Sequence, residues 1–98
     1  MNENNLAADT PYEYVLNQNY PNPFNPATVI GFSLPEIESV KFVVYNTIGE
    51  ELEVLADGTY SAGYRTVQFN ANNLNNGIYI YRLEAGNFAA VKKMILVK

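Results

Sequence analysis

Side chains that commonly do chemistry are scarce in this chain of 98 residues, which has no histidine and no cysteine. Their absence removes the usual general base, the thiol nucleophile and the usual zinc ligands. Carboxylates remain. Glu36 with Glu38, or the group Glu50, Glu51 and Glu53, could in principle supply the paired acids of a glycosidase. Their places in a predicted loop and at a predicted strand edge favour solvated charges instead.

Serines and calcium ligands give no stronger signal. Ser33, Ser39 and Ser61 have no visible base partner. Asp9 and Asp57 are the only aspartates, and no loop alternates Asp or Asn with a glycine and a final glutamate, as a calcium loop does. The sequence therefore predicts no enzyme, no cofactor and no metal site.

Two further groups of residues could bind a ligand without catalysing a reaction. The loop Asn72–Asn76 offers carbonyl groups, although turn formation explains its composition. Eight tyrosines could form a platform on which a sugar stacks, but most of them fall at positions expected in core strands. Carbohydrate binding is thus an alternative that the sequence does not favour.

The C-terminal segment Lys92–Lys98 is the strongest candidate for recognition. Its sequence, Lys-Lys-Met-Ile-Leu-Val-Lys, alternates and is basic, which is typical of an edge strand. An edge strand can pair with another chain or dock into a receptor groove, and its lysines protect it against aggregation. The competing interpretation is that it only closes the domain. An edge-strand dimer is a further prediction.

Length and charge set the remaining limits. Ninety-eight residues predict one domain, and a net charge of −4 argues against a nucleic-acid partner. No apolar run approaches the roughly 20 residues of a membrane helix, and no secretory signal peptide opens the chain. If the protein is exported, we expect the N-terminal address on a longer precursor. Residues 1–13 are polar and aperiodic, which predicts a flexible linker to an upstream cargo domain.

Hydrophobic periodicity predicts that the remaining elements are strands. The expected strands are 14–17, 28–34, 40–46, 50–56, 62–70 and 78–84, with a last strand reaching residue 98. The expected turns are Asn46–Gly49 with a positive φ at Gly49, Asp57-Gly58, and Gly86-Asn87.

A proline-rich loop, Gln18–Pro26, should lead into the strand 28–34. Its three prolines are Pro21, Pro23 and Pro26. They fix φ and remove backbone donors, so the loop must be extended and kinked. We expect Tyr20 and Phe24 to pack against the domain.

The last two strands should form a tight hairpin around Gly86-Asn87. The expected pairs are Ala85 with Phe88, Leu83 with Ala90, Tyr81 with Lys92, Tyr79 with Met94, Ile80 with Lys93, and Ile78 with Ile95. This register aims Lys92 inward beside Tyr81, where an unpaired ammonium group is costly. We expect a β-bulge to shift the register; the alternative is that Lys92 extends past the tyrosine ring to water.

The fold class follows from these elements. About seven short strands with tight turns and no long helix predict an all-β, Ig/fibronectin-III-like antiparallel β-sandwich. Leu74, Gly77 and Tyr79 also resemble the tyrosine corner of such sandwiches, in which the phenol bonds to backbone upstream.

Five segments in order carry a family resemblance. They are Gln18–Glu36, Val44–Gly49, Ala62-Gly63, Leu74–Leu83 and Lys92–Lys98. Together they resemble the type A C-terminal sorting domain of the type IX, or Por, secretion system of Bacteroidetes-type bacteria. Asn46 stands where that family often has Asp.

The resemblance implies a non-catalytic signal domain, residues 14–98. Such a domain folds in the periplasm and directs its cargo through the type IX outer-membrane translocon. A sortase-like peptidase then cuts near residues 1–15, and the cargo is secreted or attached to the cell surface. The resemblance gives as recognition residues Lys93, Met94, Leu96, Val97 and Lys98. It gives as scaffold residues Pro21, Pro23, Phe24, Pro26, Gly49, Gly77 and Tyr79.

Two other functions fit the same fold. One is an accessory Ig-like binding or spacer module, carbohydrate-binding or adhesive, on an extracellular enzyme. The other resembles the Ig-like domain of flagellar hook-capping proteins, which does not account for the terminal Lys-Met-Ile-Leu-Val-Lys. An exposed row of tyrosines would favour binding, whereas buried tyrosines and an exposed last strand would favour sorting.

Overall fold

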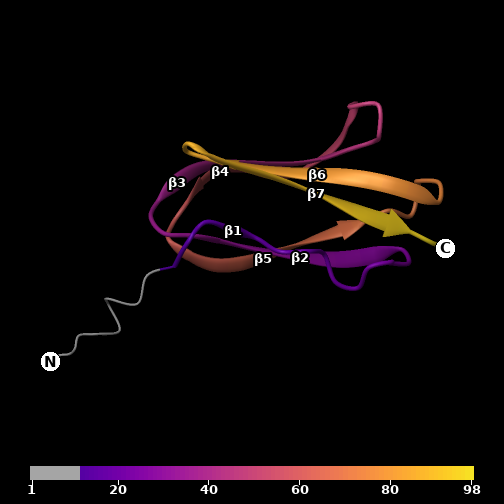
Figure 1. Ribbon diagram of the computed structural model, residues 1–98, viewed down its shortest axis with the longest axis horizontal. Coiled ribbons are helices and arrows are strands. Elements are labelled where there is room, and N and C mark those ends of the chain that lie inside the picture. The colour runs from indigo at the N-terminus through magenta and orange to yellow at the C-terminus, as the bar shows by residue number, and fades with distance from the viewer. Residues whose placement is uncertain (1–11) are drawn as a thin grey trace, which may run out of the picture.

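The computed structural model describes residues 12–98 and consists of two antiparallel sheets packed face to face (Figure 1). The strands are β1 (Val15–Leu16), β2 (Ala27–Leu34), β3 (Glu38–Tyr45), β4 (Glu51–Tyr60), β5 (Gly63–Asn70), β6 (Gly77–Ala85) and β7 (Phe88–Leu96). The predicted all-β sandwich of about seven strands is confirmed. In the part of the chain that is described, no helix is long and apolar enough to cross a membrane.

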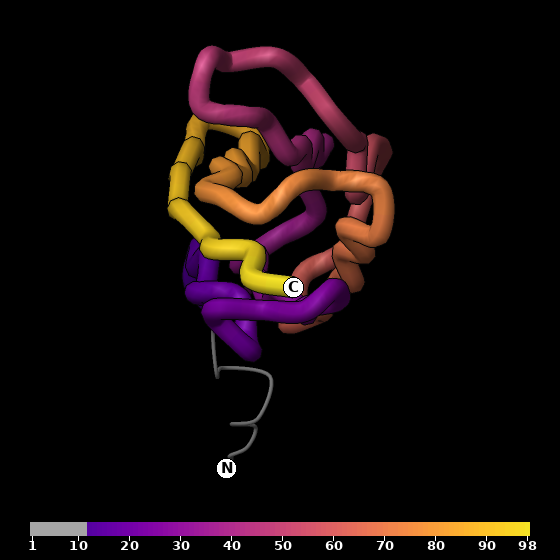
Figure 2. Tube along the Cα trace, turned by 90° about the vertical axis from the view of Figure 1, so that its right-hand side faces the viewer, coloured from indigo at the N-terminus to yellow at the C-terminus, as the bar shows by residue number. Residues whose placement is uncertain are grey.

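The strand order leaves four edges. One sheet has the order β1-β2-β5 and the other the order β4-β3-β6-β7. β1 and β5 are therefore the edges of the first sheet, and β4 and β7 are the edges of the second. Because β4 and β5 follow each other in the chain, these two edges lie on the same side of the sandwich, and β1 and β7 lie on the other (Figures 1 and 2).

The core between the sheets is built from alternate residues of the long strands. Phe32 of β2, Phe42 of β3 and Tyr81 of β6 are all 0% exposed. The Phe32 and Phe42 rings meet edge to face with centroids 5.5 Å apart, and the Phe42 and Tyr81 rings stack at 5.9 Å. The first contact joins the two sheets at the centre of the domain, and the second packs neighbouring strands of one sheet.

The hairpin of β6 and β7 has the predicted register, but the predicted bulge is wrong. Pairing runs without a shift from Gly77 opposite Leu96 to Ala85 opposite Phe88. Lys92 therefore lies opposite the fully buried Tyr81 and stays partly exposed. Because β7 is an edge strand, the lysine has solvent beside it and no bulge is needed.

The predicted turn at Asp57-Gly58 is also wrong. Both residues lie inside β4, where Asp57 pairs with Lys41 of β3. The opposite charges suit this cross-strand position, and Gly58 tolerates its φ of 156°. The chain instead turns after Tyr60.

The proline-rich loop behaves as predicted in one of its two aromatic residues. Phe24 is 2% exposed, whereas Tyr20 is 81% exposed. The backbone of Tyr20 pairs with Val29, and this directs its side chain to solvent. Most of the predicted linker, residues 1–11, lies outside the described residues, so the boundary at residue 14 stays a prediction.

Candidate functional site

The C-terminal strand has one buried and one exposed row of side chains. Met94 and Leu96 are 0% exposed and belong to the core. Lys93, Val97 and Lys98 are exposed. A partner that meets the folded domain can therefore touch these three predicted recognition residues. The other two determine whether the strand is in place.

A segment that we call the strap, Tyr14–Phe24, lies along the outer edge of β7. The Phe24 amide donates to the Ile95 carbonyl at 2.9 Å, and the Val97 amide donates to the Phe24 carbonyl at 3.0 Å. Figure 2 shows the yellow C-terminal segment beside the indigo N-terminal segment. The strap thus acts as an added strand at the end of the chain, pairing parallel with Leu96.

Two strap side chains extend this coverage. The Gln18 amide donates to the Lys93 carbonyl at 2.6 Å, and the Asn22 side-chain oxygen accepts from the Ile95 amide at 3.0 Å. β7 is an edge strand of its sheet, as predicted, but its edge is occupied from Lys93 to Val97. Only its first half stays open to pairing with another chain.

The last residue, Lys98, is held by the asparagine-rich loop before β6 and not by the strap. The Lys98 amide donates to the Asn76 side-chain oxygen at 2.9 Å, and its ammonium group donates to the Asn72 carbonyl at 2.8 Å. The asparagine-rich loop, read from the sequence as a turn, therefore also anchors the C-terminus. Composition alone gave no signal for this contact.

Prolines and a buried asparagine give the strap its shape. Pro21, Pro23 and Pro26 all follow cis peptide bonds. Asn19, 2% exposed, donates to the Pro21 carbonyl at 3.0 Å and to the Thr28 hydroxyl at 3.1 Å. A buried amide needs such partners, so this network fixes the loop against β2.

Two aromatic residues fasten the strap to the core. The Phe24 ring lies 6.0 Å from the Phe69 ring. The Tyr81 hydroxyl donates to the Asn17 carbonyl at 2.7 Å and accepts from the Asn19 amide at 2.9 Å. Burial raises the pKa of Tyr81 to about 12. Sequence reasoning placed Tyr81 in the core but did not assign it this role.

The other predicted scaffold residues shape the loops near β6 and β3. Gly49 has a φ of 88°, as predicted, and it closes the turn with its amide on the Asn46 carbonyl at 3.1 Å. Gly77 has a φ of 151°. The Tyr79 hydroxyl donates to the Asn75 carbonyl at 2.6 Å, which is the tyrosine-corner contact that the sequence suggested.

A family model described as a secretion system C-terminal sorting domain matches residues 18–98. The chain belongs to this family. Neither the curated proteins nor the solved structures give a match. The matched range begins at Gln18, within the strap, and includes β2 to β7 and the contacts that hold the C-terminus.

Membership in the family establishes what the sorting domain does in general terms. It is a type IX C-terminal sorting signal, and it directs export to the cell surface or the extracellular space. The family is one of signal domains and not of catalysts. Interaction with the secretion system and with a cargo follows from this role.

The sorting domain has an apolar patch beside Lys93 that sequence reasoning missed. Ile78 and Ile95 are cross-strand partners and are 47% and 40% exposed. Val91 and Val97, both 51% exposed, continue the outward row of β7. The alternation that assigned Met94 to the core could have identified these neighbours as the exposed face.

Tyrosines are divided between the core and the surface of the sorting domain. Tyr79 and Tyr81 are 8% and 0% exposed, as predicted for core strands. Tyr20 and Tyr64 are 81% and 54% exposed. The Tyr20 backbone pairs with β2 and Tyr64 lies in β5, so these two tyrosines belong to the sheet of β1, β2 and β5. Tyr12 is also 50% exposed.

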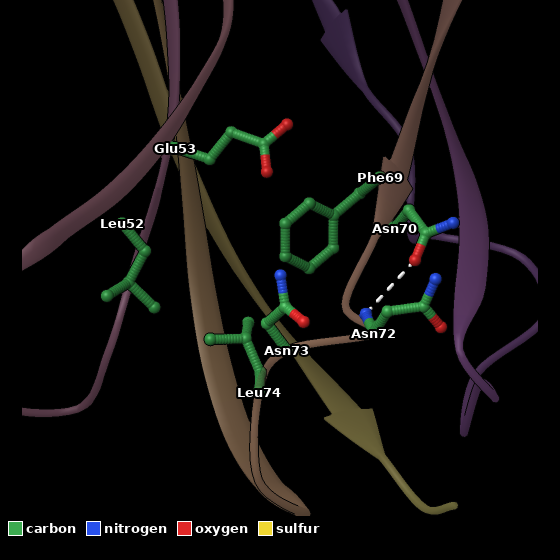
Figure 3. A pocket seen from close by; sticks show the side chains of 7 residues that line it. All are labelled: Leu52, Glu53, Phe69, Asn70, Asn72, Asn73 and Leu74. Atoms are coloured by element: carbon green, nitrogen blue, oxygen red, sulfur yellow. Dashed lines mark hydrogen bonds between the residues drawn. The ribbon is translucent and has the colours of Figure 1, made fainter.

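The carboxylates that could have formed a catalytic pair have other surroundings. Glu38 accepts a hydrogen bond from the Tyr14 hydroxyl, and this bond raises the pKa of Tyr14 to about 12. Glu50 accepts from the Asn46 amide at 2.6 Å. Glu53 lines a cavity of about 370 Å³ with Phe69 and the asparagine-rich loop (Figure 3). Residues 12–98 contain no group of three or more Asp or Glu that could hold a metal ion.

Proposed function

We propose that the type IX outer-membrane translocon recognises the folded sandwich, residues 14–98, through the outward face of β7. The support is the division of the last strand. Lys93 and Val97 are exposed next to an apolar patch, whereas Met94 and Leu96 are fully buried. A basic group beside exposed apolar side chains is a typical protein-recognition surface.

The contact uses side chains rather than strand addition at the end of the chain. The strap occupies the backbone groups of Lys93, Ile95 and Val97 that face away from β6. A receptor strand would have to displace the strap before it could pair there. We therefore propose that the intact face, presented by the strap, is the signal.

The domain acts as a ligand and then as a substrate. We propose that a sortase-like peptidase cuts the linker before Glu13, releasing an upstream cargo or transferring it to the cell surface. From Glu13 onward the backbone is held, because the Glu13 carbonyl accepts from the Ser33 hydroxyl at 2.6 Å and the Tyr14 ring stacks on Phe88 at 4.9 Å. A peptidase needs an extended and accessible segment, which favours a cut upstream of these contacts.

An export assay tests this proposal. Residues 1–98 are fused to a signal-peptide-bearing fluorescent protein in a bacterium with a type IX system, and the medium, cell surface and periplasm are blotted. We expect the intact fusion to leave the cell trimmed of the domain. A fusion that ends at Val91 should stay in the periplasm, because it lacks both the exposed residues and two core residues.

Point variants distinguish the loss of the exposed recognition face from the loss of the folded structure. Lys93→Glu with Val97→Asp changes only exposed side chains and should stop export while the purified domain still unfolds cooperatively. Ile48→Asp, at a residue 78% exposed in the turn between β3 and β4, is the control and should be exported. Export of the double variant at the normal level would show that the translocon does not read this face.

A further inference from the structure

β5 is a long strand edge that neither a covering segment nor irregular pairing protects. It pairs with β2 in continuous register from Gly63 to Asn70, and no other described strand pairs with its far side. By contrast, β4 has two register shifts against β3, and the strap covers the end of β7. A regular, unpaired strand edge is a template for a further strand.

Hydrogen-bond alternation identifies the free backbone groups of β5. The Ala71 amide donates to the Pro26 carbonyl at 2.9 Å, so the odd-numbered residues of β5 bond to β2. The amides and carbonyls of Tyr64, Thr66 and Gln68 therefore face away from β2. Three successive outward residues offer a complete ladder to an incoming strand.

Opposite charges lie at the two ends of this edge, Glu53 on β4 of the other sheet and Arg65 on β5 itself. At one end Glu53 points inward, because it pairs with the fully buried Val44, and its carboxylate reaches toward Phe69 (Figure 3). At the other end, the Arg65 guanidinium lies 5.2 Å from the centre of the Tyr60 ring. No carboxylate among residues 12–98 pairs with Arg65.

We propose that the free edge of β5, with the cavity beside it that Glu53 and Phe69 line, is a second interaction surface, which takes an extended peptide segment of a partner protein. The segment adds antiparallel to β5 and carries a basic, an apolar and an acidic residue at alternate positions. The basic residue meets Glu53, the apolar one packs on Val67, and the acidic one meets Arg65. Phe69 and Arg65 are four residues apart, about 13 Å along a strand, which matches that spacing.

Charge complementarity selects this occupant over others. The Arg65 guanidinium donates to the Ser61 carbonyl but has no carboxylate partner within the described part of the chain. An all-apolar strand would cover Glu53 and Arg65 without offering either an opposite charge, which is unfavourable. A second copy of β5, paired about Thr66, would bring another Arg65 and no carboxylate. The surface goes beyond the sorting function and does not depend on how the translocon reads β7.

The test measures binding of fluorescein-labelled heptapeptides to the whole 98-residue chain by fluorescence anisotropy. The matched probe is Thr-Lys-Thr-Val-Thr-Glu-Thr, and the neutral probe has Thr in place of Lys and Glu. Two exposed ion pairs predict that the matched probe binds about tenfold more tightly. Its addition should also slow hydrogen exchange at the amides of Tyr64, Thr66 and Gln68.

Variants test separately the backbone edge of β5 and the charge of Glu53. Thr66→Pro removes only an outward amide, so the sandwich should fold while binding is lost. Glu53→Lys should reduce the preference for the matched probe by at least about threefold, whereas Glu36→Lys, an equal charge change in an exposed loop, should leave it unchanged. Equal binding of both probes, or unchanged exchange at the three amides, would overturn the proposal. So would self-association that Thr66→Pro abolishes without any peptide binding, because the occupant would then be a second copy.

Discussion

On each side of this sandwich a strand edge of one sheet lies beside a strand edge of the other, and the two sides differ in whether the chain covers those edges. Between β2 and β7 the chain itself fills the gap, since the strap pairs with both sheets and inserts Phe24 into the core. Between β4 and β5 no described segment covers the strand edges, and the charged side chains of Glu53 and Arg65 lie beside them. The closed side is the one that carries the proposed recognition face of β7.

This difference indicates which part of the domain must be rigid. The surface that we propose the translocon recognises has to be held in one shape, and the strap fixes Lys93 to Val97 by four hydrogen bonds. On the open side, irregular pairing protects β4 alone, whereas the charges beside β5 restrict which strand can be added there, at little cost in stability. Disrupting each side should therefore have unequal effects.

Removing the aromatic anchor of the strap should have the largest effect. Phe24→Ala leaves a cavity against Phe69 and should lower the free energy of unfolding by about 3–5 kcal/mol. Urea unfolding measures this. Tyr20→Ala, in the same loop but 81% exposed, is the control and should stay within about 0.5 kcal/mol. A loss of under 1 kcal/mol for Phe24→Ala would show that the strap is not part of the core.

Removing the buried hydroxyl of Tyr81 should have the second-largest effect on stability. Tyr81→Phe leaves the Asn17 carbonyl and the Asn19 amide without this partner, at a cost of about 1–3 kcal/mol.

The same residue predicts an alkaline loss of stability. In the fold the pKa of Tyr81 is raised from 10.0 to about 12, so the folded state keeps a proton that the unfolded state loses. This contribution is complete below pH 10 and is lost as the pH rises toward 12, with a slope of about 1.4 kcal/mol per pH unit. The slope in Tyr81→Phe should be smaller by this amount. An unchanged slope would mean that Tyr81 is not the group responsible.

A single strap bond to β7 should contribute less. Asn22→Ala removes the acceptor of the Ile95 amide and should cost about 1 kcal/mol. Hydrogen exchange at Ile95 should quicken more than at Tyr79, in the middle of the hairpin. If both amides quicken equally, the strap opens only with the whole domain.

The smallest effect on stability is expected on the open side. Glu53→Gln removes a charge from the cavity and should change the free energy of unfolding by less than about 0.5 kcal/mol. It should nevertheless increase self-association, measured by light scattering, because an inward charge no longer guards the edge. Glu36→Gln, with the same charge change in a loop, should not. Strong destabilisation by Glu53→Gln would mean that the two sides are not so different.

Much of the fold followed from local pattern. Alternation located the long strands, and Gly86-Asn87 fixed the register of β6 and β7 pair by pair. The errors were also local. Asp57-Gly58 has the composition of a turn, but β4 continues through it because Asp57 pairs with Lys41 of the preceding strand, and local composition does not show this pairing. A bulge at Lys92 was expected because an inward ammonium group is costly, but the edge position predicted for this strand already gives the lysine access to solvent.

Only part of the candidate site could be predicted from the local sequence pattern. The segment Lys92–Lys98 could be selected from its charge and alternation, and the same alternation marks Met94 and Leu96 as buried. Its contacts with Gln18 and Asn22 could not, because they join residues more than 70 positions apart through amide side chains with no periodicity.

The sequence alone determined the strand period, the turn residues, the lack of thiol and imidazole chemistry, and the basic, apolar last segment. Each is a property of neighbouring residues. Tertiary structure alone decided which strand edges are covered. Coverage depends on how the chain returns on itself, and here the strap returns to β7 while nothing described returns to β5. This closure leaves Lys93, Val97 and Lys98 on the surface and holds the strand beneath them in place.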